Sequence, residues 1–297
     1  MSQVEVILTG RTYYVADGQY QLPNDSVELA RIEDQAVGLV ELMHQKVIHA
    51  PINNPAFILD VGCGTAAVTC YLGSKFPYTQ VYGIDISPVR SSAPIPQNVS
   101  FIQGDLKSLL KEKDARLRRN SFDYIFHRLL ILGVTDWSDY VSDVASLLQP
   151  GGWAEMQDYN IKMYRNGREC SQEWQWLKIL KKAASRKGID LDCGSNIKGY
   201  MERAGFTDVV AREYSVPFGG WASDMRPETK RIGQHAGREY GPMYFHLMAK
   251  MLDGMGYEAE ELAELQEAAK SDMSEELGKE IVFYVTIGRK PEMSRFL

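Results

Sequence analysis

Apolar side chains in the first part of the chain follow the repeat of a helix. Between residues 27 and 48 they recur every three or four positions, which is the spacing of one helix face. Residues 24–26, an Asn-Asp-Ser run, offer side-chain oxygens that cap a first turn. Pro51 and Pro55 follow and are expected to end the helix. The pattern therefore predicts one long helix before the first buried strand.

From Phe57 onward, short apolar runs alternate with longer segments of helical period. Strands separated by helices pair in parallel through right-handed crossovers. This order predicts an α/β fold with a Rossmann-like, seven-stranded, mostly parallel sheet and helices on both faces. Residues 150–152, Pro-Gly-Gly, are expected to break the chain before the fifth strand. The expected strands are 57–61, 80–87, 99–105, 122–128, 153–159, 205–216 and 279–291, and the expected helices are 66–75, 106–119, 136–149, 171–187 and 195–204.

Residues 219–279 have a mostly helical pattern and are rich in Met, Trp, Tyr and His. They stand between two strands that we expect to pair, so they are predicted to be an insertion. Three parts follow from this. An N-terminal arm and helix (1–50) would cover a cofactor site, a Rossmann-like core (51–218 and 280–297) would hold it, and a helical cap (219–279) would bind a substrate.

The composition narrows the classes of protein that the pattern allows. The chain has 297 residues, 44% of them hydrophobic, which is enough for the core of one large domain or of a domain with a cap. A net charge of −6 disfavours a nucleic-acid partner, which needs a basic face. The four cysteines have no zinc spacing, so we expect free thiols and no metal. Without a signal-peptide pattern or a span-length apolar stretch, we expect a cytoplasmic protein with no membrane partner.

The segment FILDVGCGTA combines a glycine-rich turn with a carboxylate. Gly62, Gly64 and Ala67 fit the dinucleotide-binding fingerprint. Asp60 stands directly before the turn, where it would repel a pyrophosphate by roughly 1 kcal/mol or more. S-adenosyl-L-methionine has no phosphate and carries a sulfonium and an ammonium, both cationic. Asp60 therefore favours this cofactor over NAD.

Two further strands of the predicted sheet end in aspartate. Asp85, followed by Ile86, stands at the distance from the glycines at which an acidic residue binds ribose hydroxyls. Asp105 can accept a hydrogen bond from the adenine amino group, while Leu106 donates its backbone N–H to the ring. Each aspartate alone is as well explained as a helix N-cap. Together they predict an adenosyl site at the carboxyl ends of the strands, where ligands bind in open parallel sheets.

The stretches LDVGCGTA, GIDIS, QGDL and LLQPGGWAEMQD, in this order, resemble the motif series of class I S-adenosylmethionine-dependent methyltransferases. A narrower resemblance is to the LaeA-like (UMTA-type) methyltransferases of filamentous fungi. It rests on GRTYY…YQLPNDSVELARIEDQ, from Gly10 to Gln35, on FDYIFHRLL, and on the Gly-x-Trp element that ends at Trp221. Members of that family often carry a histidine where this chain has Ala36, so no role is carried over from it.

The resemblance implies a methyl transfer that leaves S-adenosyl-L-homocysteine as product, with a small-molecule acceptor such as a fungal secondary metabolite. It also implies that the N-terminal segment covers the cofactor, with Tyr14 and Tyr20 as contacts. Arg31 is a weaker candidate, because it is equally placed to pair with Glu28 or Asp34.

A general base is needed only for a poorly acidic hydroxyl or a protonated amine. His127, at the predicted carboxyl end of the fourth strand, is the first candidate for a catalytic base and for a contact with the cofactor. Packing alone is the alternative for its ring. Asp158 is the second catalytic candidate. The residues expected to line the substrate pocket are Gln157, Tyr159, Trp221 and His246, the last with a core position as the alternative.

Three other functions stay open at this point. A relative of this kind can bind the cofactor and catalyse a cyclisation or pericyclic reaction without methyl transfer. A LaeA-like regulator would have nuclear partners, although the chain has no basic nuclear-localisation run. A dehydrogenase is disfavoured by Asp60. The sequence leaves a monomer and a homodimer equally possible.

Overall fold

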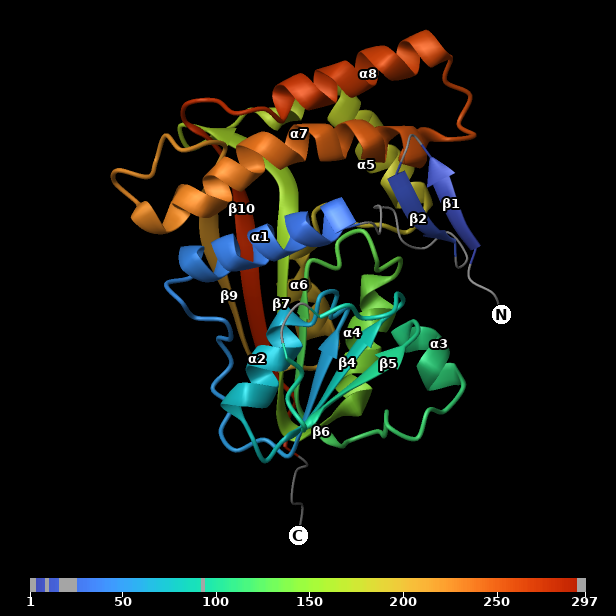
Figure 1. The fold of residues 1–297 in the computed structure, drawn as a ribbon, viewed down its shortest axis with the longest axis vertical. Coiled ribbons are helices and arrows are strands. Elements are labelled where there is room, and N and C mark those ends of the chain that lie inside the picture. Colours follow the sequence, from blue (N-terminus) through green and yellow to red (C-terminus); the bar gives the residue numbers. More distant parts are fainter. Residues whose placement is uncertain (1–3, 9–10, 16–25, 92–93, 293–297) are drawn as a thin grey trace.

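The computed structural model describes residues 4–8, 11–15, 26–91 and 94–292 (Figure 1). Its main sheet has the strand order β5-β4-β3-β6-β7-β10-β9, and the short β8 pairs with β7 beside this row. Five of the strands run parallel in the order β5 to β7, and β10 is antiparallel to both of its neighbours. The predicted seven-stranded, mostly parallel sheet is confirmed. The strands are β3 (Phe57–Val61), β4 (Gln80–Asp85), β5 (Val99–Gln103), β6 (Phe122–Arg128), β7 (Leu148–Arg165), β8 (Arg168–Glu169), β9 (Thr207–Pro217) and β10 (Lys279–Arg289).

Helices cover both faces of the sheet, as predicted. On one face, α3 (Leu106–Lys111), α4 (Trp137–Leu147) and α6 (Cys193–Arg203) bury one layer of the core around the sheet, which includes Ile125 of β6. On the other face, α2 (Ala67–Lys75) packs on the other layer of this core, which includes Tyr124 and Phe126. Successive residues of β6 thus point to opposite faces, as a strand requires.

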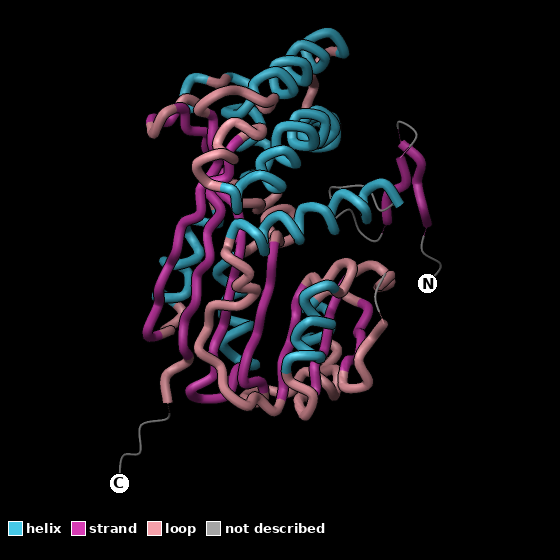
Figure 2. Tube along the Cα trace, turned by 60° about the vertical axis from the view of Figure 1, so that its left-hand side comes forward, coloured by secondary structure: helices cyan, strands magenta, loops and turns pink. Residues whose placement is uncertain are grey.

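A second core lies beyond the short strands. The long strands β7, β9 and β10 extend past the carboxyl ends of β3 to β6, and α5 (Gln175–Arg186), α7 (Lys230–Leu252) and α8 (Ala259–Asp272) pack around this extension (Figures 1 and 2). Its buried side chains include Leu180, Met248 and Phe283. The helical block predicted before the last strand is present as α7 and α8.

Helix α1 (Ser26–Leu42) crosses between the two cores and packs on α7 (Figure 1). The two helices approach closely at Gly38, where an added Cβ would lie 3.0 Å from backbone atoms of Ile232. Residues 27–48 were predicted to be helical throughout, but the helix ends earlier because His44 and Gln45 adopt positive φ angles of 52° and 63°. The chain then returns to the sheet.

Two further predictions of local structure were wrong. The helix expected over 106–119 ends at Lys111, because Lys113 has a φ of 59° and the Asp114 carboxylate accepts the backbone N–H of Arg116 in a tight turn. The Pro-Gly-Gly segment does not break the chain before the fifth strand. It lies inside β7 as an irregularity of the pairing with β6.

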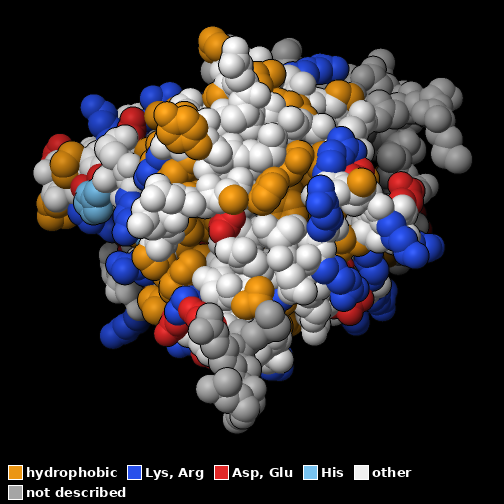
Figure 3. All heavy atoms as spheres, turned by 90° about the horizontal axis from the view of Figure 1, so that it is seen from below, with side chains coloured by type: hydrophobic (Ala, Val, Ile, Leu, Met, Phe, Trp, Pro, Cys, Tyr) orange, Lys and Arg blue, Asp and Glu red, His pale blue; other side chains and the backbone are white. Residues whose placement is uncertain are grey.

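At the N-terminus, β1 (Val4–Leu8) and β2 (Arg11–Val15) form an antiparallel pair that the sequence did not predict. No helix among the described residues is long and apolar enough to cross a bilayer. Seen from below, the molecule carries Lys and Arg side chains interspersed with acidic and hydrophobic ones (Figure 3).

Candidate active site

A cavity of about 340 Å³ opens at the carboxyl ends of β3, β4, β5 and β6, and α1 and α7 supply its opposite walls. This volume is in the range of small-molecule sites. One end is formed by the glycine-rich turn and the aspartates at the strand ends. The other end is mainly apolar and is lined by Tyr159, Ile161, Leu191, Met243, Tyr244, Leu247 and Ile281.

The glycine-rich turn adopts a backbone that side chains disfavour. Gly62 and Gly64 have φ angles of 69° and 53°, and an added Cβ at Gly62 would collide with Leu130. The N–H groups of Gly62 and Cys63 donate to the carbonyl oxygen of Ile84, at 2.8 and 2.9 Å, which ties the turn to β4. The turn therefore exposes backbone atoms without side chains to the cavity.

Asp85 connects that turn to the end of β4. Its Oδ2 accepts the N–H of Gly64 at 2.8 Å, and its Oδ1 accepts the N–H of Ser87 at 2.9 Å. Burial raises the pKa of this carboxyl, and the two backbone hydrogen bonds oppose the shift. Asp85 is thus held rigidly at the cavity wall.

Asp60 is almost fully buried behind the same turn. It is 2% exposed, and its Oδ2 accepts the Thr69 hydroxyl at 2.6 Å. Burial raises its pKa to about 6, although the Thr69 hydrogen bond and the Arg128 cation lower it. The hydrogen bond and the nearby cation do not fully offset the cost of burying this charge. A cationic ligand in the cavity would therefore stabilise the carboxylate.

Asp105 is the N-cap of α3. Its Oδ2 accepts the N–H of Ser108 at 2.9 Å, so the capping explanation describes its observed contact, and it lines the cavity as well. Seven residues predicted to bind the cofactor thus share one cavity: Asp60, Gly62, Gly64, Asp85, Ile86, Asp105 and Leu106. Of the predicted arm contacts, Tyr20 and the Tyr14 side chain lie outside what the structure describes.

His127 does not lie on the described wall of the cavity. The alternation of β6 turns its ring toward α4, where Nδ1 lies 2.9 Å from the Tyr140 hydroxyl. Burial lowers its pKa to about 3, and within the described structure its Nε2 has no hydrogen-bond partner. Its neighbours Phe126 and Arg128 line the cavity instead. The ring of His127 thus packs against α4, and a role of His127 as a base or as a cofactor contact stays a prediction.

Asp158 is also buried behind the wall rather than in it. Its Oδ1 accepts the N–H of Tyr159 at 3.0 Å, and its Oδ2 is buried without a hydrogen-bond partner in the described structure. Burial raises its pKa to about 8, so at neutral pH it holds a proton and cannot take one up. Its position supports the cavity-lining loop that follows β6, not a catalytic base.

Three residues predicted for the substrate pocket lie elsewhere. Gln157 faces the opposite side of β7 from Asp158 and donates through Nε2 to Glu155 at 2.6 Å. Trp221 follows β9 and packs on Arg226, with 5.8 Å between the guanidinium carbon and the ring centroid. His246 falls outside the α7 face formed by residues 240, 243, 244 and 247, which are spaced for one side of a helix. Tyr159 is the one member of this group that lines the cavity.

A family model described as a methyltransferase domain matches residues 39–211. The chain belongs to this family. The match confirms the predicted class of enzyme, a methyltransferase that depends on S-adenosyl-L-methionine.

Two relatives of this methyltransferase come from Aspergillus species. The chain is 25% identical over 290 residues to methyltransferase pytC of Aspergillus terreus, covering 95% of this chain and 87% of the relative. It is 28% identical over 222 residues to the secondary metabolism regulator laeA of Aspergillus fumigatus, covering 72% of this chain and 58% of the regulator. Among solved structures, a putative sarcosine dimethylglycine methyltransferase from Galdieria sulphuraria aligns with a TM-score of 0.48 and 16% identity, covering 91% of this chain and 89% of the other.

Several residues that line the cavity of the methyltransferase were not predicted from the sequence. Gln35 of α1 and Tyr240 of α7 meet across the cavity, with 2.9 Å between Nε2 and the hydroxyl. Arg128 also lines the cavity, and it directly follows His127, the first candidate for a catalytic base. The helical spacing of residues 240–247 indicated a shared face, but only the packing of α7 on α1 shows that this face looks into the cavity.

The described part of the methyltransferase contains no group of His, Cys, Asp and Glu side chains that could hold a metal ion. All four cysteines are free thiols, as predicted. Arg31 pairs with Glu28, with 2.6 Å between Nη2 and Oε1. Glu28 is one of the two partners that the sequence predicted for Arg31.

Proposed function

We propose that this methyltransferase binds S-adenosyl-L-methionine at the polar end of the cavity and transfers its methyl group to a small acceptor at the apolar end. The observation that carries the proposal is that Asp60, Asp85 and Asp105 converge with the glycine-rich turn on one cavity that continues between α1 and α7. The acceptor class, an apolar or aromatic small molecule, is supported by the lining of that second end.

The residues fit the cofactor in charge and in shape. Asp60 offers a buried negative charge to the cationic end of the cofactor, and Asp85 offers carboxylate oxygens to the ribose hydroxyls. The positive φ angles of Gly62 and Gly64 form a tight turn without side chains, which a cofactor can approach closely. Asp105 and the Leu106 N–H suit an adenine ring. We assign these roles as proposals.

The bound cofactor supplies a methyl group that its sulfonium already activates. The chain has to orient the acceptor and exclude water, which can account for much of the rate. Helices α1 and α7 close the cavity from two sides. The arm (1–50), core (51–218 and 280–297) and cap (219–279) are proposed as the units that divide this work.

We also propose that the acceptor is a secondary metabolite and that the enzyme acts in the cytoplasm, as a monomer or a homodimer. The first point is supported by the relatives named as a fungal methyltransferase and as regulators of secondary metabolism.

Calorimetric titration with S-adenosyl-L-methionine, S-adenosyl-L-homocysteine and NAD tests the cofactor. We expect both adenosyl ligands to bind and NAD not to bind, and tight NAD binding would refute the proposal. Asp85→Ala should weaken binding of both adenosyl ligands strongly. Asp114→Ala, which removes a surface carboxylate that pairs with Arg116, is the matched control and should bind normally.

Methyl transfer itself is tested with isotope-labelled cofactor and a metabolite extract, followed by mass spectrometry. A product that gains one labelled methyl group supports the proposed reaction. A product of unchanged mass that forms only with the cofactor present would point to a cyclase instead.

A further inference from the structure

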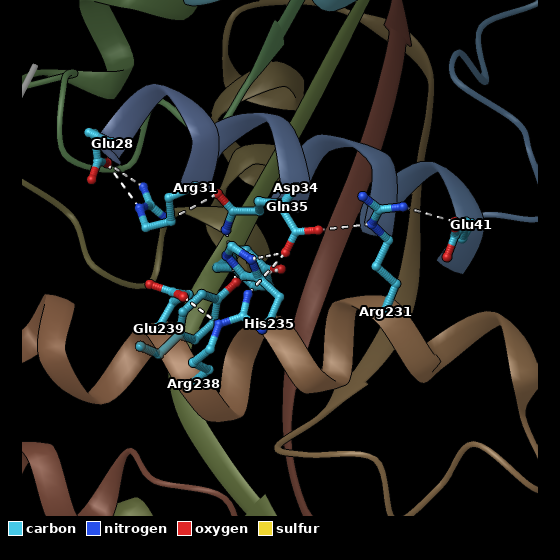
Figure 4. A network of polar contacts seen from close by, with 11 residues as sticks. Glu28, Arg31, Asp34, Gln35, Glu41, Arg231, His235, Arg238 and Glu239 are labelled. Carbon is cyan, nitrogen blue, oxygen red and sulfur yellow. Dashed lines mark hydrogen bonds and ion pairs between the residues drawn. The ribbon is translucent and has the colours of Figure 1, made fainter. Parts of the chain in front are cut away.

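A chain of hydrogen bonds crosses the cavity from α1 to β7. Arg31 Nη1 donates to Gln35 Oε1 at 3.4 Å, and Gln35 Nε2 donates to the Tyr240 hydroxyl at 2.9 Å. The Tyr240 hydroxyl donates to the Tyr159 hydroxyl at 3.0 Å. All four side chains line the cavity. Figure 4 shows Arg31 and Gln35 side by side on α1, facing α7.

The orientation of the Gln35 amide follows from the guanidinium at the start of this chain, and the geometry of the two hydroxyls gives the direction of the last hydrogen bond. A guanidinium only donates, so the Gln35 oxygen must face Arg31 and the Gln35 amide nitrogen must face Tyr240. The Tyr240 oxygen accepts from that nitrogen, and the Tyr240 hydroxyl donates its own proton to the Tyr159 oxygen. The Tyr159 oxygen accepts this proton, so the proton of Tyr159 must point to another group.

No other residue described in the structure receives that proton, since the Tyr159 hydroxyl has Tyr240 as its sole hydrogen-bonding neighbour there. The surroundings are apolar: Ile161, Leu191 and Ile281 share this part of the wall, and the Phe283 ring lies 5.0 Å from the Tyr159 ring. Burial raises the pKa of Tyr159 far above its ordinary value, so the hydroxyl stays protonated. A donor left over in an apolar wall favours a ligand that brings an acceptor.

We propose that the Tyr159 hydroxyl, oriented by the chain from Arg31 through Gln35 and Tyr240, donates a hydrogen bond to a carbonyl oxygen of the methyl acceptor. The acceptor is then an apolar or aromatic carbonyl compound rather than a hydrocarbon. This inference rests on the proposed function, because it places the acceptor in the apolar end of the same cavity. Tyr159 is a specificity residue in this scheme, and Gln35 and Tyr240 are positioning residues.

Two probes of matched shape test the donor. Acetonaphthone carries a carbonyl group, and isopropenylnaphthalene carries a methylene carbon in place of the carbonyl oxygen. Their affinities are measured by ligand-observed NMR, with and without S-adenosyl-L-homocysteine. We expect the wild type to prefer the ketone by roughly five- to tenfold, the effect of one buried hydrogen bond.

Tyr159→Phe should abolish the preference while keeping the affinity for the hydrocarbon. Gln35→Leu should reduce the preference without abolishing it, because Tyr240 can then turn its proton elsewhere. Tyr244→Phe is the matched control: it removes a hydroxyl from the same wall that is not part of the chain. This variant should keep the preference.

Equal affinity of the wild type for the two probes, or binding of neither, would overturn the inference. So would a preference that survives Tyr159→Phe or is lost in Tyr244→Phe. Binding of S-adenosyl-L-homocysteine to each variant shows that it is folded and tests the proposed function separately. If that ligand fails to bind while the ketone preference follows Tyr159, the cofactor assignment fails and the donor assignment holds.

Discussion

Asp60 and Asp158 are both buried carboxyls with raised pKa values, yet their surroundings prepare them for different tasks. Asp60 lines the cavity and has a pKa of about 6, so at neutral pH it is mostly charged. Asp158 is outside the cavity wall with a pKa of about 8, so it is mostly neutral. A charged carboxylate at the cavity attracts cations, whereas a neutral carboxyl behind the wall accepts the backbone N–H of Tyr159.

The charge of Asp60 predicts a pH-dependent affinity for the cofactor. In the free enzyme Asp60 takes up a proton as the pH falls through about 6, so the affinity for S-adenosyl-L-methionine should fall roughly tenfold per pH unit below that point. Calorimetry between pH 5 and 8 measures this slope. Asp60→Asn should bind weakly at every pH with a flat profile, and a slope that persists in this variant would contradict the assignment. S-adenosyl-L-homocysteine, which lacks the sulfonium charge, should show a smaller effect.

Asp158 predicts the opposite kind of pH effect, one on stability. Its pKa is raised in the folded state, so the unfolded chain loses the proton near pH 4 and the folded chain only near pH 8. The Asp158 contribution to stability is therefore complete below the unfolded pKa and is lost as the pH rises through this window. Asp158→Asn should gain stability over the wild type by a few kcal/mol as the pH rises. Urea denaturation at pH 5 and pH 8 measures the difference, and a gain that is independent of pH would contradict this account.

At the scale of elements, the contact between α1 and α7 closes the cavity. Asp34 of α1 accepts from Arg231 at 2.9 Å, from His235 at 2.9 Å and from Arg238 at 3.3 Å, all on α7 (Figure 4). Burial would raise the pKa of Asp34, but hydrogen bonds from His235 and Arg231 outweigh it and lower the pKa. The carboxylate thus acts as a polar clamp beside the close helix contact at Gly38.

Asp34→Ala should loosen this clamp. We expect the free energy of unfolding to fall by about 1–2 kcal/mol at pH 7, with faster hydrogen exchange in α1 and weaker cofactor binding. The effect should shrink as the pH falls through the lowered pKa, because the protonated side chain contributes less. Glu41→Ala removes a longer and more exposed pair with Arg231, at 3.8 Å, and should cost less. Unchanged exchange in α1 of Asp34→Ala would show that the clamp is not needed.

At the scale of the whole molecule, the cavity is the place where two cores meet. The sheet with α2, α3, α4 and α6 supplies the polar end, and the extension of β7 and β10 with α7 supplies the apolar end. A ligand that fills both ends therefore bridges parts of the chain that are packed largely independently. Ligand binding should therefore slow hydrogen exchange in segments that are far from the glycine-rich turn in the sequence.

Hydrogen exchange with S-adenosyl-L-homocysteine tests this bridging. We expect protection not only in residues 62–67 but also in α1 and in the loop 129–136, which line the same cavity. The outer strand β9, none of whose residues lines the described cavity, is the internal control and should change little. Ligand at a hundredfold excess over its Kd should raise the free energy of unfolding by about 2.7 kcal/mol. Protection confined to residues 62–67 would contradict closure by α1.

Local patterns predicted much of this molecule because the forces behind them are local. The alternation of strands and helices follows from burial at periods of two and 3.6 residues, and it anticipated the mostly parallel sheet and the pairing of its last two strands. The glycine-rich turn and Asp85 were found because a tight turn and a strand end impose particular residue types within a short window. Helix ends were less predictable, since the turns at His44 and Lys113 depend on backbone angles that many residues adopt.

The sequence by itself determined the fold class, the glycine-rich turn that suits an adenosyl cofactor, and the preference of Asp60 for a cationic ligand. Only the tertiary structure decided which residues face the second half of the cavity. His127 and Phe126 are neighbours in sequence, and the register of β6 with its neighbours sends one to α4 and the other to the cavity. Gln35, Tyr159 and Tyr240 are far apart in the chain and meet because α1 docks on α7 above β7. Such long-range contacts leave no periodic trace in the sequence, and they form the part of the site that we propose selects the acceptor.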